Sequence, residues 1–245
     1  MKSNSIIMGM LVEVCIAQQA NKEDINEVFA YLRSIDEQFS TYKKTSEVTK
    51  INSKALEKND YSKEMKKVLK IGEKTKKETD GYFDVWNNGR LDPSGIVKGY
   101  AIKAASEILK KKGYKNFFVE IAGDMQISGL NENRKWKVGI KNPLNSSEIL
   151  KVLKVSGKGI ATSGTYARGN HIYNPKNEIL QREIVSLTVI ARNVLEADRM
   201  ATGAFAMGRG AIPFLEKLKG FEAFAITKDN KGIATKGFRK YVINS

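Results

Sequence analysis

The chain has 245 residues, of which 41% are hydrophobic, so it is long enough to bury a full core. It carries 42 lysines and arginines against 27 aspartates and glutamates, and the resulting formal charge of +15 makes an anionic partner worth considering. Its single cysteine, Cys15, excludes an internal disulfide framework and any zinc site built from several cysteines.

The distribution of the basic residues favours a solvated surface over a nucleic-acid interface. The densest lysine clusters, residues 63–77 and 110–112, fall on predicted helices, and glutamates interrupt the longer one. We therefore expect no nucleic-acid partner. No apolar run approaches the ~20 residues needed to span a bilayer, so no transmembrane segment is expected. No export signal is recognised, which predicts a cytoplasmic protein; the alternative is an exported mature form whose leader has been removed.

Hydrophobic periodicity predicts helices and strands without regular βαβ alternation. Apolar residues alternate at period two over residues 6–17, which predicts one strand with a buried face and places Cys15 in the core. Helical spacing appears at residues 22–39, 62–77, 93–112, 196–208 and 211–219. Strand patterns appear at residues 116–121, 136–141, 148–155, 184–191, 223–227 and 238–243. This order favours an α+β fold, and the length is compatible with one large domain or with two lobes that share a site.

The segment at residues 92–101 has the features of a well-specified helix start. Asp92 is placed to cap the helix, and Pro93 suits the first helical position. The N–H groups of such a start can hold a phosphate, Gly95 and Gly99 permit close approach, and Lys98 adds a full positive charge. An ordinary capped helix that packs through its glycines is the competing interpretation.

Two further segments supply oxygen ligands. Gly123 and Asp124 follow a predicted strand and put a carboxylate at its end, as an ordinary turn would also do. Asp198 and Thr202 are four residues apart and therefore share one helix face. A carboxylate, a hydroxyl and a nearby carbonyl are hard ligands suited to Mg²⁺ or Ca²⁺, although a cap and a helix hydroxyl explain the same pair.

His171, the only histidine, lies in a polar stretch that Pro175 keeps out of a helix interior or an inner strand. The preceding residues 159–166 are rich in glycine and hydroxyl groups, including Thr162 and Ser163, and are interpreted as a loop. Backbone N–H groups and hydroxyls there could converge on an anion beside the imidazole. A surface histidine next to an ordinary turn is the alternative.

Taken in order, these segments resemble the ApbE-like flavin transferase family, the FAD:protein FMN transferases. The resemblance covers nearly the whole chain. The matching segments are residues 8–9, 39–42, 80–84, 92–101, 122–124, 161–166, 171–175 and 197–202. It implies an α+β fold with mixed, mostly antiparallel sheets and packed helices, organised as a single two-lobed domain over residues 1–245. It also implies flavin in a cleft and a divalent metal at the pyrophosphate. It also implies transfer of FMN from FAD to a threonine or serine hydroxyl of an acceptor protein, with AMP as the other product.

The resemblance also implies roles for individual residues. Gly95, Asp198 and Thr202 would hold Mg²⁺, and His171 would take the proton from the attacking hydroxyl. Met8 and Tyr42 would border the flavin, while Lys98, Thr162 and Ser163 would face the phosphates. Asp92, Gly123 and Asp124 complete the expected cofactor-binding set. The expected partner is an acceptor flavoprotein with a Ser/Thr flavinylation motif, a redox-pump subunit being one candidate.

Three positions depart from the family pattern. Ala122 stands where a second glycine is usual, Asn174 replaces an aspartate, and residues 177–178 replace Thr-Gly. Loss of a negative charge at Asn174 would alter the surroundings of the expected base. The alternatives are therefore an FAD-binding protein without transferase activity, or an FAD pyrophosphatase that gives FMN and AMP.

Overall fold

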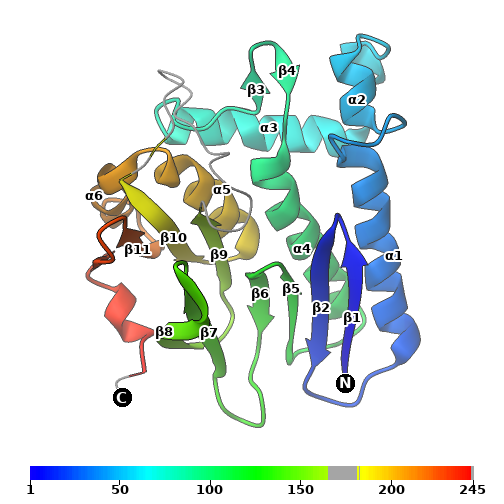
Figure 1. Ribbon diagram of the computed structural model, residues 1–245. Helices are drawn as coiled ribbons and strands as arrows, with labels where there is room; N and C mark the ends of the chain where they lie inside the picture. Colours follow the sequence, from blue (N-terminus) through cyan, green and yellow to red (C-terminus); the bar gives the residue numbers. More distant parts are fainter. Residues whose placement is uncertain (165–180, 182, 244–245) are drawn as a thin grey trace.

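One antiparallel sheet organises the chain in the computed structural model, which describes residues 1–164, 181 and 183–243 (Figure 1). Within these ranges the sheet has eight strands in the order β1-β2-β5-β6-β9-β10-β11-β12, and its strand pairs are antiparallel. Two further antiparallel pairs, β3–β4 and β7–β8, lie outside it. The prediction of an α+β fold with mostly antiparallel sheets is confirmed.

The strands are β1 (Lys2–Ile7), β2 (Met10–Ile16), β3 (Trp86–Asn87), β4 (Arg90–Leu91), β5 (Phe117–Ile121), β6 (Asp124–Ser128), β7 (Trp136–Asn142), β8 (Asn145–Val155), β9 (Gly159–Gly164), β10 (Ile184–Ala191), β11 (Glu222–Thr227) and β12 (Gly232–Ala234). The α-helices are α1 (Lys22–Phe39), α2 (Glu47–Asn52), α3 (Lys63–Glu78), α4 (Ser94–Lys111), α5 (Val194–Phe205) and α6 (Ala211–Glu216). Short 3₁₀ turns are η1 (Lys58–Asp60), η2 (Gly208–Gly210) and η3 (Phe238–Lys240). None of the described helices combines the length and hydrophobicity of a membrane span.

The core is divided between the two faces of the sheet. On one face, α1 and α4 cover β1, β2 and β5, with α3 packed against α4 and α5, and α5 and α6 pack on β9, β10 and β11. On the other face, the β7–β8 hairpin packs against β6 and β11. Successive side chains of β9 point to opposite faces of the sheet. Ala161 packs with α5 on the helical face, whereas its neighbour Ile160 packs on the face covered by the β7–β8 hairpin. Helices α4 and α5 are thereby set beside each other over the centre of the sheet (Figure 1).

The predicted strand at residues 6–17 is instead a hairpin. Met8 and Gly9, at φ +57° and +68°, form a two-residue turn of type I′, in which both residues have positive φ. Ile7 pairs with Met10 across this turn, so the side chains that face inward have odd residue numbers in β1 and even residue numbers in β2. Ile6 is therefore 69% exposed while Val12 is fully buried. Cys15 is half-buried rather than in the core.

The predicted strand at residues 238–243 is also wrong. Phe238 begins the turn η3, is 2% exposed, and stacks on Phe224 with ring centroids 5.5 Å apart. Beyond the turn, Val242 forms only an isolated bridge to Leu153 of β8. The strand that pairs with β11 is β12, which begins directly after residues 229–231. Burial of Phe238 against Phe224 is a tertiary contact that the alternating pattern could not reveal.

Candidate functional site

Helices α4 and α5 approach most closely where Gly99 faces Asp198. A Cβ atom on Gly99 would lie 2.7 Å from Asp198 Cβ and 3.0 Å from Leu195 Cα, so a side chain there would push the helices apart. The Gly99 N–H donates to Asp198 Oδ2 at 2.7 Å. In a regular α-helix this N–H bonds the carbonyl of Gly95, so the Asp198 carboxylate competes with that carbonyl for it.

The same contact brings together all three residues predicted to hold the metal. A Cβ on Gly95 would lie 3.0 Å from Thr202 Cγ2 and 3.5 Å from Thr202 Oγ1, which places the hydroxyl beside the Gly95 backbone. Thr202 Oγ1 donates to the Asp198 carbonyl one turn earlier, at 3.1 Å. This bond uses the hydroxyl proton and leaves oxygen lone pairs that can accept or coordinate.

Lys98 and Asp124 form the second half of the cluster. Asp124, at the start of β6, is 1% exposed, and its Oδ2 lies 2.8 Å from Lys98 Nζ. Its Oδ1 accepts from the Thr162 N–H at 2.9 Å. Thr162 Oγ1 in turn lies 2.9 Å from the hydroxyl of Thr188 on β10. Asp124 thus ties α4 to β9 across the sheet.

The predicted loop around Thr162 and Ser163 is, over residues 159–164, the strand β9. Its residues pair with β10 along the whole strand, and Met125 of β6 pairs with Ile160 on the other side. Ser163 is 8% exposed. Because the Thr162 N–H is bonded to Asp124, it does not form the expected anion cradle with its neighbours. Gly159, one of the glycines that suggested a loop, permits close packing instead, because a Cβ atom there would lie 1.9 Å from the Val194 nitrogen.

The charges of this cluster favour an additional cation. Asp198 is 5% exposed. Burial, followed by the neighbouring Asp124 carboxylate, raises the pKa of Asp198, while Lys98 and the Gly99 N–H oppose the rise. Two carboxylates thus share one lysine in a buried place. A divalent cation would stabilise the ionised form, and the carboxylate, hydroxyl and carbonyl oxygens suit Mg²⁺.

Backbone and hydroxyl oxygens are essential to such a site. Across the described parts of the chain no group of three His, Cys, Asp or Glu side chains is placed to hold a metal ion. Asp198 would therefore be joined by Thr202 and the Gly95 carbonyl, with water or substrate oxygens completing the shell, as is usual for Mg²⁺.

The start of α4 is fixed as the sequence predicts, one residue later. Asp92 Oδ1 accepts from the Ser94 N–H at 3.0 Å, but Pro93 occupies the cap position and the helix begins at Ser94. The Asn52 side-chain amide fixes Leu91, the residue before Asp92: it donates to the Leu91 carbonyl at 2.9 Å and accepts from the Leu91 N–H at 2.7 Å. Asp92 itself is exposed.

The remaining predicted residues lie in turns and connecting segments away from the α4–α5 contact, or outside the described residues. Met8 is half-buried in the β1–β2 turn, and Tyr42 is 95% exposed in the segment after α1. Gly123, at φ +91°, lies in the turn that leads into Asp124. His171 and Asn174 fall outside the described residues, so the prediction of a base at His171 stays a prediction.

Two buried side chains that sequence reasoning missed hold α5 in place. Gln126 on β6 accepts from the Val194 N–H at 2.9 Å, at the first residue of α5. Arg199, 2% exposed, pairs with Glu78 at the end of α3 and with Glu196 one turn earlier in α5. Neither role was predicted, because Val194 is 68 residues from Gln126 and Glu78 is 121 residues from Arg199.

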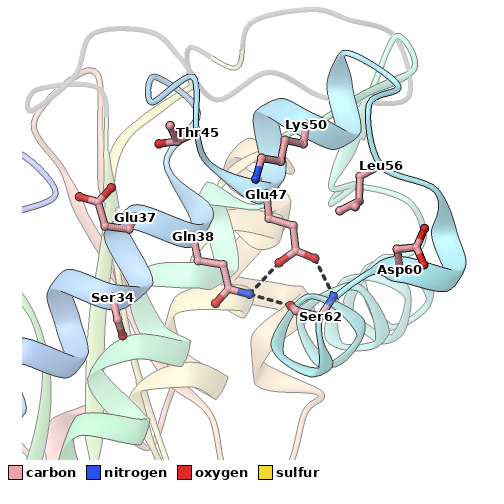
Figure 2. A pocket seen from close by; sticks show the side chains of 9 residues that line it. All are labelled: Ser34, Glu37, Gln38, Thr45, Glu47, Lys50, Leu56, Asp60 and Ser62. Atoms are coloured by element: carbon pink, nitrogen blue, oxygen red, sulfur yellow. Dashed lines mark hydrogen bonds between the residues drawn. The ribbon is translucent and has the colours of Figure 1, made fainter.

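A pocket of about 480 Å³ between α1, α2 and α3 contains none of the predicted site residues (Figure 2). Its polar groups are largely bonded to one another: Glu47 accepts from the Gln38 side chain at 2.7 Å and from the Ser62 N–H at 2.7 Å. Gln38 also donates to Ser62 Oγ at 2.6 Å. We interpret this network as a connection among three helices, and we locate the candidate site at the α4–α5 contact.

Comparison with solved structures defines the fold class. The flavin transferase ApbE from Vibrio cholerae superposes with a TM-score of 0.85 over 98% of this chain and 99% of its own, at 22% identity. The ApbE protein from Thermotoga maritima gives a TM-score of 0.89 over 100% and 99%, at 21% identity. The antiparallel sheet with α4 and α5 side by side is therefore the fold of these proteins.

The sequence comparison assigns the family. The model of the ApbE family matches residues 8–88 and 85–225, and the chain belongs to the ApbE family. The FAD:protein FMN transferase of Salmonella typhimurium is 28% identical over 156 residues, covering 59% of this chain and 45% of that protein. The corresponding protein of Haemophilus influenzae is 24% identical over 276 residues, covering 86% and 80%. The chain thus spans a little under half the length of the first curated relatives it matches.

Proposed function

We propose that this protein transfers FMN from FAD to a hydroxyl of an acceptor protein, with Mg²⁺ held at the α4–α5 contact. The observation that carries the proposal is the convergence of Gly95, Asp198 and Thr202, beside the Lys98–Asp124 ion pair, in a chain of the ApbE family. The relatives' names, FAD:protein FMN transferase, supply the reaction class.

The proposed reaction needs positioning and charge neutralisation more than covalent help from the protein. The acceptor hydroxyl oxygen forms a bond to the FMN phosphorus, the pyrophosphate P–O bond breaks, and AMP leaves with the bond electrons. Bound Mg²⁺ would neutralise charge on the pyrophosphate. Lys98 would direct its ammonium to the phosphates while Asp124 holds its side chain. His171 is the proposed acceptor of the hydroxyl proton, since a neutral imidazole is a suitable base near pH 7.

The acceptor is proposed to be a flavoprotein that presents a threonine or serine in a flavinylation motif, such as a redox-pump subunit. The direct test incubates the purified protein with FAD and Mg²⁺, with and without a threonine-containing acceptor peptide. AMP release and peptide mass are then measured. We expect acceptor-dependent AMP and a peptide mass increased by FMN. Bound FAD with no AMP in either sample would contradict the proposal.

The metal role is tested with Asp198→Asn, which keeps the shape of the side chain and removes its charge. We expect turnover to fall by about a hundredfold or more, with loss of the Mg²⁺ dependence, because a bound metal contributes several kcal/mol to such a reaction. Asp229→Asn, an exposed aspartate next to the β11–β12 turn, is the matched control. An unaltered Mg²⁺ titration in Asp198→Asn would exclude Asp198 as a ligand.

The proposed base is tested with His171→Ala. We expect FAD binding to remain largely intact and turnover to fall by a factor of about 10²–10⁴, the usual contribution of a general base. Binding is followed by flavin fluorescence and turnover by AMP release. Unchanged turnover would remove His171 from the mechanism.

A second candidate function is hydrolysis of FAD to FMN and AMP, or FAD binding alone. It is favoured by Asn174 and by Ala122, which stands where the family has a glycine, at a turn position with φ +49° two residues before Asp124. AMP released at the same rate with and without acceptor, together with an unmodified peptide and free FMN, would support hydrolysis.

A further inference from the structure

A second pocket, of about 560 Å³, is lined by residues of β8, β11, β12 and η3 and contains no residue of the α4–α5 cluster. Its floor is apolar and includes Phe224, Phe238 and Val242. Three cationic side chains, those of Lys151, Lys236 and Arg239, also line it, and these three residues are exposed. An apolar hollow lined with cations is suited to an anion that has an apolar part.

The positive charge at this pocket is not neutralised by ion pairs within the part of the chain that the structure describes. Lys151, Lys236 and Arg239 form no ion pair with any described residue, and the same holds for Lys154 and Lys240 nearby in sequence. On the α1 side of the molecule, by contrast, Lys112 pairs with both Asp24 and Glu27.

The carboxylates closest to the pocket are engaged elsewhere. Glu216 accepts from the Lys236 backbone N–H at 2.9 Å. Glu222 accepts from the Thr235 hydroxyl. Both carboxylates thus hold the chain around residues 235–236 and do not pair with the cationic heads. The pocket is left with an excess of positive charge that a ligand can satisfy.

The form of the pocket decides which anion it suits. Phe224 and Phe238 stack on each other and are only 7% and 2% exposed, so neither presents a ring face on which a nucleic-acid base can stack. The hollow can instead receive an aliphatic side chain. We propose that this pocket binds an acidic segment of a protein partner, with an apolar side chain inside and Asp or Glu residues against Lys151, Lys236 and Arg239. The proposal does not depend on flavin transfer.

The probe is a fluorescein-labelled peptide with one leucine flanked by several aspartates and glutamates, and its binding to the full chain is followed by fluorescence anisotropy. Two variants separate charge from shape. Lys151→Glu with Arg239→Glu reverses the charge, whereas Ala234→Trp fills the pocket without changing charge. Lys70→Glu with Lys111→Glu, on exposed positions of α3 and α4, is the control with the same change of net charge.

We expect the peptide to bind and both pocket variants to weaken it by about tenfold or more, while the control pair changes affinity by less than about threefold. A neutral analogue with Asn and Gln should not bind. Equal weakening by the control pair would overturn the proposal, because the attraction would then be due to net charge. Absence of peptide binding would overturn it too, as would equally strong competition by a single-stranded oligonucleotide. AMP release in the presence of acceptor is also measured for the pocket variants. This second measurement distinguishes a failure of the peptide-binding proposal from a failure of the proposed transferase activity.

Discussion

Ala122 occupies the first position of the two-residue turn between β5 and β6, where its φ is +49°. A left-handed conformation costs an L-residue roughly 1–2 kcal/mol, and glycine is free of that cost. We expect Ala122→Gly to raise the free energy of unfolding by about 0.5–1 kcal/mol, after allowance for the greater flexibility of glycine in the unfolded chain.

The comparison for Ala122→Gly is Ala30→Gly, an exposed position within α1, where the same exchange should destabilise by about 1 kcal/mol. Urea unfolding of both variants measures the difference. Destabilisation by both would show that the turn at residues 122–123 does not strain the alanine.

Glu120 on β5 lies directly opposite Glu13 on β2. Burial, followed by the Glu13 charge, raises the pKa of Glu120, while the Gly123 N–H, Lys141 and Lys2 oppose the rise. A raised pKa means that the folded state binds the proton more tightly than the unfolded state. Stability is therefore lost as pH rises from the unfolded value of 4.5 through the higher folded value.

Glu120→Gln removes this ionisation. We expect the variant to be more stable than the parent at pH 8, by about 0.2–1 kcal/mol, with no gain at pH 4. Urea midpoints at the two pH values measure it, and Glu57→Gln, an exposed position, is the control. A gain of the same size at both pH values would argue against charge as the cause.

At the scale of elements, α5 is fixed against α3 by a buried ion pair. Arg199 is 2% exposed and is shared by Glu78 and Glu196. Arg199→Ala deletes a large buried side chain together with its charged hydrogen bonds, and leaves Glu78 and Glu196 with only their exposed partners Lys74 and Arg192, so it should destabilise by about 2–5 kcal/mol. The same Glu78 also pairs with Lys74 at 3.6 Å in an exposed position, where Lys74→Ala should cost less than about 1 kcal/mol.

Urea unfolding of the two variants provides the measurement. Similar small effects would mean that Arg199 does not anchor α5. Because Asp198 and Thr202 are on the same helix, a loosened α5 would also disturb the oxygen cluster at Gly95.

Elements were predicted well where a local pattern is long and has clear ends. The helices at residues 22–39 and 62–77 and the strand at residues 184–191 agree with α1, α3 and β10 to within a residue. Strand β6 was missed because Asp124, Met125, Gln126 and Ile127 are all buried and show no alternation. Strand β9 was taken for a loop because its glycines are turn residues in most contexts.

At the scale of the molecule, the order of strands in the sheet assembles the site. β6 and β9 are neighbours although about 30 residues separate them in the sequence, and this adjacency lets the Thr162 N–H reach Asp124. Charge is uneven on the same scale. Lysines of α3 and α4 pair with acids, whereas Lys151, Lys236 and Arg239 at the second pocket do not pair with any described residue.

The sequence by itself determined the fold class, the beginning of α4, the shared face of Asp198 and Thr202, and the ordered segments of the ApbE family. These are local signals, in which spacing, caps and turn residues act over a few positions. Only the tertiary structure decided that the Gly99 N–H meets Asp198, 99 residues away, and that Asp124 accepts from Thr162, 38 residues away. Such contacts depend on the close approach of α4 to α5 and on strand order, because burial joins groups that no local pattern connects.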